Sequence, residues 1–147
     1  MLANRSIPPA VVIPELAYRD VGEAAAWLCA AFGFQERLRI ANHRVQLMLG
    51  AGAIVVVEGQ AGDDAGRAPG PPTHGVMVRI ENVDQHHARA VQHGALILRP
   101  PTDYAYGERQ YTALDPGGHV WTFSETIDDV DPASWGGTLL GSSAAGA

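Results

Sequence analysis

The chain has 147 residues, of which 46% are hydrophobic and 18% are charged, as expected for one ordinary globular domain. A net charge of −6 and a pI of 5.4 argue against nucleic-acid binding, since no Lys/Arg cluster marks a phosphate-binding face. The single cysteine, Cys29, excludes an intramolecular disulfide framework. The start lacks the apolar core of a signal peptide, and no apolar run approaches the roughly 20 residues of a membrane span. These features predict a cytoplasmic protein.

Three segments with few apolar residues frame the predicted domain. Residues 1–10 are expected to be a loose lead-in and residues 136–147 a flexible tail. Residues 59–73 consist mainly of turn-forming Gly, Pro and Asp with Ala, so they are expected to be a linker. The remaining residues predict one domain, 11–135, that is divided at this linker.

The first block, residues 11–58, opens with a strand pattern over residues 11–18. A helix follows, because Asp20 can cap its start, Glu23 completes a capping box and Gly33 can end it. Its apolar residues recur at helical spacing and give one buried face. Three strand patterns complete the block, at about 35–40, 44–49 and 53–58.

The second block, residues 74–126, repeats this order. A strand over residues 74–80 precedes a helix that Asn82 can cap and Gly94 can end. Three strands are then expected, at about 95–99, 109–114 and 120–124.

The positions of matching residues in the two blocks differ by a nearly constant offset. Asp20 precedes Asn82 by 62 residues, and Gly52 precedes Gly118 by 66, which pairs Val56 with Thr122. Each block is therefore predicted to be a βαβββ module, which alone would leave free edges and one bare face. Two modules side by side predict an α+β fold: a curved, cup-like sheet with its helices outside. The concave face of that sheet can hold a ligand.

This layout, together with four short sequence motifs, resembles the vicinal oxygen chelate superfamily of glyoxalases, bleomycin resistance proteins and dioxygenases. The most specific motif is Asp115-Pro-Gly-Gly-His-Val-Trp121; the other motifs are Tyr18-Arg-Asp-Val21, Phe32-Gly-Phe34 and Tyr106-Gly-Glu-Arg109. The resemblance covers about residues 11–135. It implies the fold more strongly than an activity, because this fold hosts isomerases, dioxygenases, thiol transferases and drug-binding proteins.

The resemblance also implies four metal-ligand slots, filled by His, Gln or Glu on the first and last strands of each module. Counted from the nearest motif, these slots fall on Ile13, Val56, Gly75 and Thr122. None of the four is a good metal ligand. His74 is one residue from its slot, and a one-residue slip turns a side chain to the opposite face, so it would need a bulge to reach the floor. We therefore expect the metal-free branch of the family, with no cofactor.

Several other residues have two interpretations each. His74 and Glu58 could form a metal pair, but solvent-facing strand ends are favoured. Tyr104 and Tyr106 could form an aromatic wall and Arg109 a cationic hook over the cup, suited to a flat or acidic ligand. Alternatively, this stretch is a structural turn in which Arg109 pairs with a carboxylate.

The last strand and the second helix carry further predictions. If Thr122 faces the cup, Trp121 faces the helices and belongs to the core. The adjacent His86 and His87 point about 100° apart on a helix, so we expect surface positions or partial packing rather than a ligand role. Trp135, after the last strand, could pack on a neighbouring subunit.

Two functions remain open. The first is a homodimeric binding protein whose cup holds a small hydrophobic or aromatic molecule, as the resemblance to antibiotic-sequestering resistance proteins implies. Its predicted ligand-binding residues are Ile13, Val56, His74, Tyr104, Tyr106, Arg109 and Thr122, with no catalytic residue, no membrane and no nucleic acid. The second is a glyoxalase-like lyase or isomerase, either metal-dependent through His74 and Glu58 or using His43, His74 or a tyrosine as acid or base. Whether modules are exchanged between subunits is also open.

Overall fold

The computed structural model describes residues 2–59 and 73–141, and its first module has the predicted order of elements. These are β1 (Glu15–Tyr18), α1 (Val21–Phe32), β2 (Gln35–Ile40), β3 (Arg44–Leu49) and β4 (Gly52–Glu58). They form a four-stranded sheet, the first sheet, in the order β1-β4-β3-β2. β1 runs parallel to β4, and the other neighbours are antiparallel.

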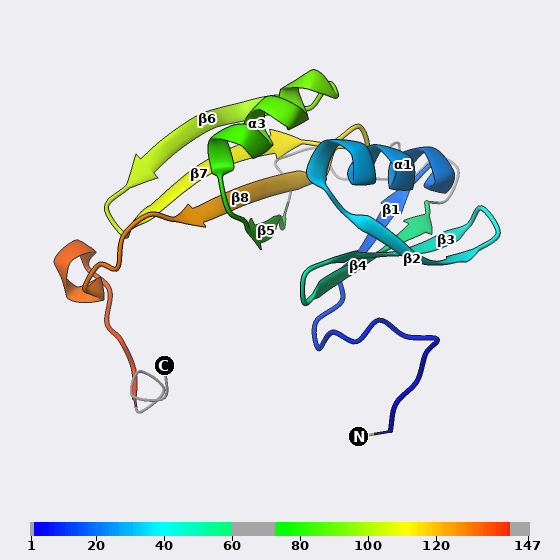
Figure 1. The fold of residues 1–147 in the computed structure, drawn as a ribbon, viewed down its shortest axis with the longest axis horizontal. Helices are drawn as coiled ribbons and strands as arrows, with labels where there is room; N and C mark the ends of the chain where they lie inside the picture. The colour runs from blue at the N-terminus through cyan, green and yellow to red at the C-terminus, as the bar shows by residue number, and fades with distance from the viewer. Residues whose placement is uncertain (1, 60–72, 142–147) are drawn as a thin grey trace.

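The second module repeats this arrangement. Its elements are β5 (Val76–Arg79), α3 (Val83–Gln92), β6 (Leu96–Tyr104), β7 (Glu108–Leu114) and β8 (Val120–Thr126), followed by the 3₁₀ helix η1 (Pro132–Trp135). The second sheet has the order β5-β8-β7-β6, with β5 parallel to β8. The predicted α+β class and the two βαβββ modules are confirmed. The strands form two separate sheets, each with one helix against one face (Figure 1).

Local sequence explains where the helices begin and end. The Asp20 carboxylate accepts a hydrogen bond of 2.9 Å from the Glu23 backbone N–H, and α1 ends at Gly33 with a φ of 85°. The Asn82 side chain caps α3 in the same way, accepting from the Gln85 N–H at 3.2 Å. The predicted starts of both helices and the end of α1 at Gly33 are therefore confirmed, whereas α3 ends at Gln92 with His93 as its C-cap, one residue before the predicted Gly94.

Two strands differ from their predicted bounds at positions next to proline. β1 starts at Glu15 rather than residue 11, directly after Pro14, which has no backbone N–H to donate. β6 continues through Pro100 and Pro101 to Tyr104, with register shifts on either side of Arg99. It is an edge strand, where proline is tolerated. The predicted linker falls mainly on residues 60–72, outside the described residues, as do residues 142–147 of the tail.

Both modules contribute aromatic side chains to one core on the helix side of the sheets. The Phe32 ring at the end of α1 lies 5.3 Å from the Trp121 ring and 4.7 Å from the Phe123 ring, between centroids. Phe34 lies 5.6 Å from Trp121. Trp121 and Phe123 are fully buried, which confirms the prediction that Trp121 belongs to the core.

The Asp115-Pro-Gly-Gly-His turn fastens the second module to the first. The buried Asp115 carboxylate accepts hydrogen bonds from the Tyr18 hydroxyl, the Trp121 indole N–H and the backbone N–H groups of Gly117 and His119. The His119 ring also bonds to the carbonyl of Ala17 at 2.8 Å. A Cβ atom at Gly117 would lie only 2.6 Å from the Tyr18 ring, so glycine is required where the turn meets that ring.

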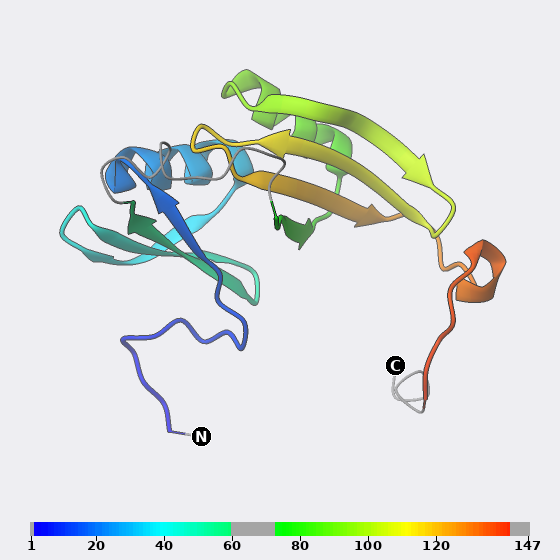
Figure 2. The same ribbon diagram turned by 180° about the vertical axis from the view of Figure 1, so that it is seen from behind.

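In both orientations of the ribbon, one face of each sheet carries no helix (Figure 2). We call these surfaces the helix-free faces of the first and second sheets. Among the described residues, no helix is both long enough and apolar enough to cross a membrane.

Candidate functional site

Strand alternation identifies the residues on the helix-free face of the second sheet. Because Trp121 and Phe123 point to the core, Thr122 and Ser124 point to the opposite face. Thr122 pairs with Thr112 on β7, and their hydroxyl oxygens lie 3.2 Å apart. Thr122 therefore lies on the helix-free face, opposite to Trp121, while its role in binding stays a prediction.

A chain of hydrogen bonds crosses this face from β7 to β8. The Tyr106 hydroxyl donates to the Gln110 side-chain oxygen at 3.2 Å, and the Gln110 amide donates to the Ser124 hydroxyl at 3.0 Å. Ser124 then donates to the Glu108 carboxylate at 2.6 Å. Gln110 and Ser124 are both buried, so the chain is a fixed structural feature. We call these four residues the polar chain.

Three members of the polar chain were not predicted from the sequence: Glu108, Gln110 and Ser124. The signal that could have found them is their alternation with core residues, since Gln110 neighbours Tyr111 and Ser124 neighbours Phe123. Their mutual contact depends on the pairing of Gln110 with Ser124 across β7 and β8, which only the structure supplies.

An aromatic group lies beside the polar chain. The rings of Tyr104 and Tyr106 are stacked, with centroids 5.3 Å apart and planes within 9° of parallel. Trp135 from η1 lies 5.3 Å from Tyr106 and is 46% exposed. The Arg99 guanidinium donates to the Tyr104 hydroxyl at 2.7 Å. We call Tyr104, Tyr106 and Trp135 the aromatic group; two of its members are the predicted aromatic wall, and Trp135 packs within its own chain.

The surroundings of Tyr106 raise the pKa of its hydroxyl above the ordinary value. Partial burial raises its pKa, and the neighbouring Tyr104 and Glu108 raise it further. The O–H therefore remains a donor to Gln110 at neutral pH.

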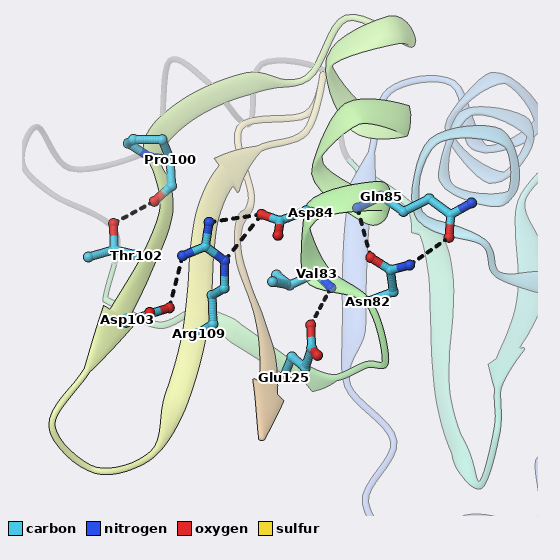
Figure 3. Close-up of polar contacts among 9 residues, drawn as sticks. All are labelled: Asn82, Val83, Asp84, Gln85, Pro100, Thr102, Asp103, Arg109 and Glu125. Atoms are coloured by element: carbon cyan, nitrogen blue, oxygen red, sulfur yellow. Dashed lines mark hydrogen bonds and ion pairs between the residues drawn. The ribbon is translucent and has the colours of Figure 1, made fainter. Parts of the chain in front are cut away.

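Arg109 does not face the ligand-binding side, so the predicted cationic hook is wrong. Its guanidinium donates to the Asp103 carboxylate at 2.8 Å and twice to Asp84 at the start of α3, at 3.2 and 2.9 Å (Figure 3). These carboxylates raise the pKa of Arg109. The alternative interpretation, a structural ion pair, is the observed one: Arg109 ties β7 to β6 and α3.

The expected position of Val56 on the cup floor is also wrong. Val56 is fully buried in the helix-side core with Leu16 and Val45. Its neighbour Val55 takes the position on the helix-free face. The register shows this directly. In the first sheet Val55 of β4 pairs with Glu15 of β1, and in the second sheet Thr122 of β8 pairs with Met77 of β5, the corresponding strand.

Val56 was misplaced because the two modules were aligned on two glycines, Gly52 and Gly118, that have different structural roles. Gly118 lies in a turn with a φ of 83°, a conformation that favours glycine. Gly52 is already the first residue of β4. Matching them shifted the count by one residue, and one residue in a strand reverses the side chain.

The other two predicted residues lie at the starts of the modules. Ile13 is half-buried, just ahead of β1, and His74 is exposed, just ahead of β5. At the neighbouring Gly75, an added Cβ would approach the Val120 carbonyl oxygen to 3.3 Å. The binding roles of Ile13 and His74 stay predictions.

The residues in the family's four metal slots do not fit a divalent cation. With the corrected register, these slots hold Ile13, Val55, Gly75 and Thr122, which together offer one hydroxyl and no carboxylate, imidazole or amide. Across residues 2–59 and 73–141, no three His, Cys, Asp or Glu side chains cluster as a metal site would require.

The fold and the sequence agree on the class of protein: this chain belongs to the Glyoxalase/Bleomycin resistance protein/Dioxygenase superfamily, whose profile matches residues 10–123. Among solved structures, TioX from Micromonospora sp. ML1 is 32% identical and has a TM-score of 0.63; the match covers 78% of this chain and 97% of TioX.

More distant structures share the fold. A family enzyme from Burkholderia phytofirmans PsJN is 19% identical with a TM-score of 0.67, over 78% of this chain and 97% of its own. The genomically encoded fosfomycin resistance protein FosX from Listeria monocytogenes is 16% identical with a TM-score of 0.62, over 85% of this chain and 94% of its own. None of the curated proteins compared with this chain matches it.

Proposed function

We propose that the protein binds a small hydrophobic or aromatic molecule on the helix-free face of the second sheet, without a metal ion and without covalent chemistry. The observation that carries this proposal is the aromatic group beside the polar chain, on a sheet face that no helix covers. Stacking against Tyr106 and Trp135 would hold a flat ring, since aromatic pairs attract at such separations.

Exposed apolar side chains on the same face favour burial of an apolar ligand. Met77 is 66% exposed and Leu96 is 61% exposed, and the register places them opposite Thr122 and Leu114. Ligand sites typically combine such apolar surface with a few polar groups that set orientation.

The polar chain would supply the orientation. Tyr106 uses its O–H hydrogen inside the chain, so its oxygen is left as an acceptor, and Glu108 is a charged acceptor. The proposed ligand therefore carries N–H or O–H groups beside its aromatic ring.

We further propose that two copies associate as a homodimer in the cytoplasm, covering the helix-free faces, and that the biological role is sequestration. The name of FosX, a fosfomycin resistance protein, is consistent with a role in antibiotic resistance within this fold. A role of this chain in antibiotic resistance is part of our proposal.

A thermal-shift screen tests the proposal, because a ligand that binds only the native state must raise the melting temperature. Aromatic natural products and acidic metabolites are screened against the wild type, Tyr106→Ala, Trp135→Ala and the control Val91→Ala, whose side chain is exposed on α3. We expect an aromatic compound to stabilise the wild type and the control but neither site variant. Equal stabilisation of all four proteins, or chemical conversion of the compound, would contradict the proposal.

A further inference from the structure

Arg99 on β6 lies on the helix-free face of the second sheet, next to the aromatic group. It pairs with Thr112 on β7, and residues paired across two strands share a face. Thr112 points away from the core because its neighbours Tyr111 and Ala113 are buried in it. The Arg99 guanidinium donates from Nη1 to the Tyr104 hydroxyl at 2.7 Å. A permanent positive charge therefore lies beside the stacked tyrosines.

The second edge of this guanidinium, formed by Nε and Nη2, has no protein acceptor. Across residues 2–59 and 73–141, Nη1 is the only Arg99 atom with a hydrogen-bond partner, and no carboxylate forms an ion pair with this side chain. In Arg109 of the same module, the corresponding edge binds the Asp84 carboxylate at 3.2 and 2.9 Å. A carboxylate matches the two neighbouring N–H groups of such an edge, so the open edge of Arg99 is suited to a carboxylate from a ligand.

Two hydroxyl groups lie beside Arg99 in one row across the sheet. Thr112 pairs with Arg99 on one side and with Thr122 on the other. The two threonine oxygens are 3.2 Å apart, and that hydrogen bond uses one O–H hydrogen, so the other O–H is left as a donor. The row thus presents a charged donor edge and a hydroxyl donor, which together suit an anionic group.

Tyr104 separates this donor row from the charged acceptor of the polar chain. The Tyr104 hydroxyl contacts Arg99, whereas the Tyr104 backbone pairs with Glu108. A ring stacked on the aromatic group would therefore meet a cation toward one end and an anion toward the other. Because like charges repel, an acidic substituent is favoured only at the end near Arg99.

We propose that the ligand is an aromatic acid whose carboxylate binds Arg99 and the hydroxyl pair of Thr112 and Thr122. An N–H or O–H group at the opposite end of its ring faces Glu108. This inference rests on the proposed function, because it needs a ring held by the aromatic group. It assigns to Arg99 the cationic role that the sequence suggested for Arg109.

Pairs of an acid and its amide test this ligand class, because the two members of a pair differ mainly in charge. Para-aminobenzoate is compared with para-aminobenzamide, and para-hydroxyphenylacetate with its amide, by NMR titration of the full-length protein. We expect each acid to bind the wild type about ten-fold more tightly than its amide, since charged hydrogen bonds are the stronger ones. Added salt should reduce this preference.

Three variants identify the residue responsible. Arg99→Gln should remove the preference for the acid, and Arg99→Lys should restore only part of it, because an ammonium group cannot form two parallel hydrogen bonds. Arg79→Gln is the control and should keep the full preference. Arg79 is exposed on the opposite edge strand, β5, and pairs with Ser124, so its loss changes the net charge equally on the same face.

The outcomes separate this inference from the proposed function. Amides that bind as tightly as the acids, with Tyr106→Ala weakening both, would refute the acidic ligand class and leave the aromatic site supported. A preference that persists in Arg99→Gln, or that Arg79→Gln removes equally, would overturn the assignment of Arg99. If neither acid binds the wild type, the inference is wrong whatever the thermal-shift screen finds.

Discussion

At the scale of single residues, Glu108 is the end point of the polar chain and its only charged member. Three successive hydrogen bonds point toward its carboxylate, from Tyr106 through Gln110 and Ser124. A ligand N–H that bonds to Glu108 would gain the extra strength of a charged acceptor.

Removing that charge should weaken binding. Glu108→Gln is expected to lower the affinity for a ligand found by screening about ten-fold, because a hydrogen bond to a charged group contributes about 1.5–3 kcal/mol. Isothermal titration measures the change, with the exposed strand-end substitution Glu58→Gln as control. An unchanged Kd for Glu108→Gln would remove Glu108 from the site.

His86 is the residue whose ionisation is tied to folding. Its ring lies partly buried between the modules. The Nε2–H donates to the Phe32 carbonyl at 3.1 Å, and Nδ1 forms a hydrogen bond of 2.5 Å with the Tyr111 hydroxyl. Burial lowers the pKa of His86 below its ordinary 6.5. The surface-or-partly-packed prediction for this helix position agrees with that placement.

The lowered pKa sets a direction for stability. Below pH 6.5 the unfolded chain binds a proton at His86 more readily than the folded chain, so the free energy of unfolding should fall as the solution is acidified. Urea unfolding at pH 7.5, 6.5 and 5.5 measures this for the wild type, His86→Gln and the exposed control His43→Gln. His86→Gln should show a weaker decrease than the other two; parallel curves for all three proteins would contradict the assignment.

At the scale of elements, the Asp115 turn determines how the modules meet. One buried carboxylate serves two side chains and two backbone N–H groups, and one of those side chains, Tyr18, comes from the first module. Burial, together with the charge and hydrogen bond of Asp115, raises the pKa of Tyr18, so its hydroxyl stays a donor.

Loss of this carboxylate should be costly. Asp115→Ala leaves buried donors on Tyr18 and Trp121 without their acceptor, and we expect the free energy of unfolding to fall by about 3 kcal/mol. Denaturant unfolding measures it, with the exposed Asp129→Ala as control. A loss no larger than that of the control would mean that the turn does not hold the modules together.

Helices and strands were predicted more completely from the sequence than the contacts between them. Helical spacing, caps and the repeated order predicted both modules, and strand alternation placed Trp121 and Thr122 on opposite faces. The position of Val56 was wrong because two glycines with different roles were aligned. The cationic hook at Arg109 was inferred from its closeness in sequence to Tyr104 and Tyr106, and that closeness does not show that β7 presents Arg109 to α3. The polar chain escaped prediction because it joins residues on different strands, and their register is set by tertiary pairing.

At the scale of the whole molecule, the chain has two helix-free faces of different chemistry. On the first, the donors Arg37 and Gln46 bond to the carbonyls of Arg5 and Ser6, and the second presents aromatic rings and acceptors. The proposed homodimer would cover exposed apolar residues such as Met77 and Leu96 on the second face.

Light scattering after size-exclusion chromatography tests that association. We expect twice the mass of the chain for the wild type. Met77→Glu should shift the mass toward that of the monomer, because it places a charge in the apolar contact. A wild-type monomer at all concentrations would contradict the dimer.

Metal-independent binding at the aromatic group can be measured by titration calorimetry of one screened aromatic ligand, with and without EDTA. For the wild type we predict the same Kd with and without EDTA. Tyr106→Ala should raise the Kd at least about ten-fold, because a stacked aromatic side chain contributes a large share of the binding energy. Val91→Ala should leave the Kd unchanged. Binding that disappears in EDTA, or whose Kd is unchanged by Tyr106→Ala, would show that the aromatic group is not a metal-independent binding site.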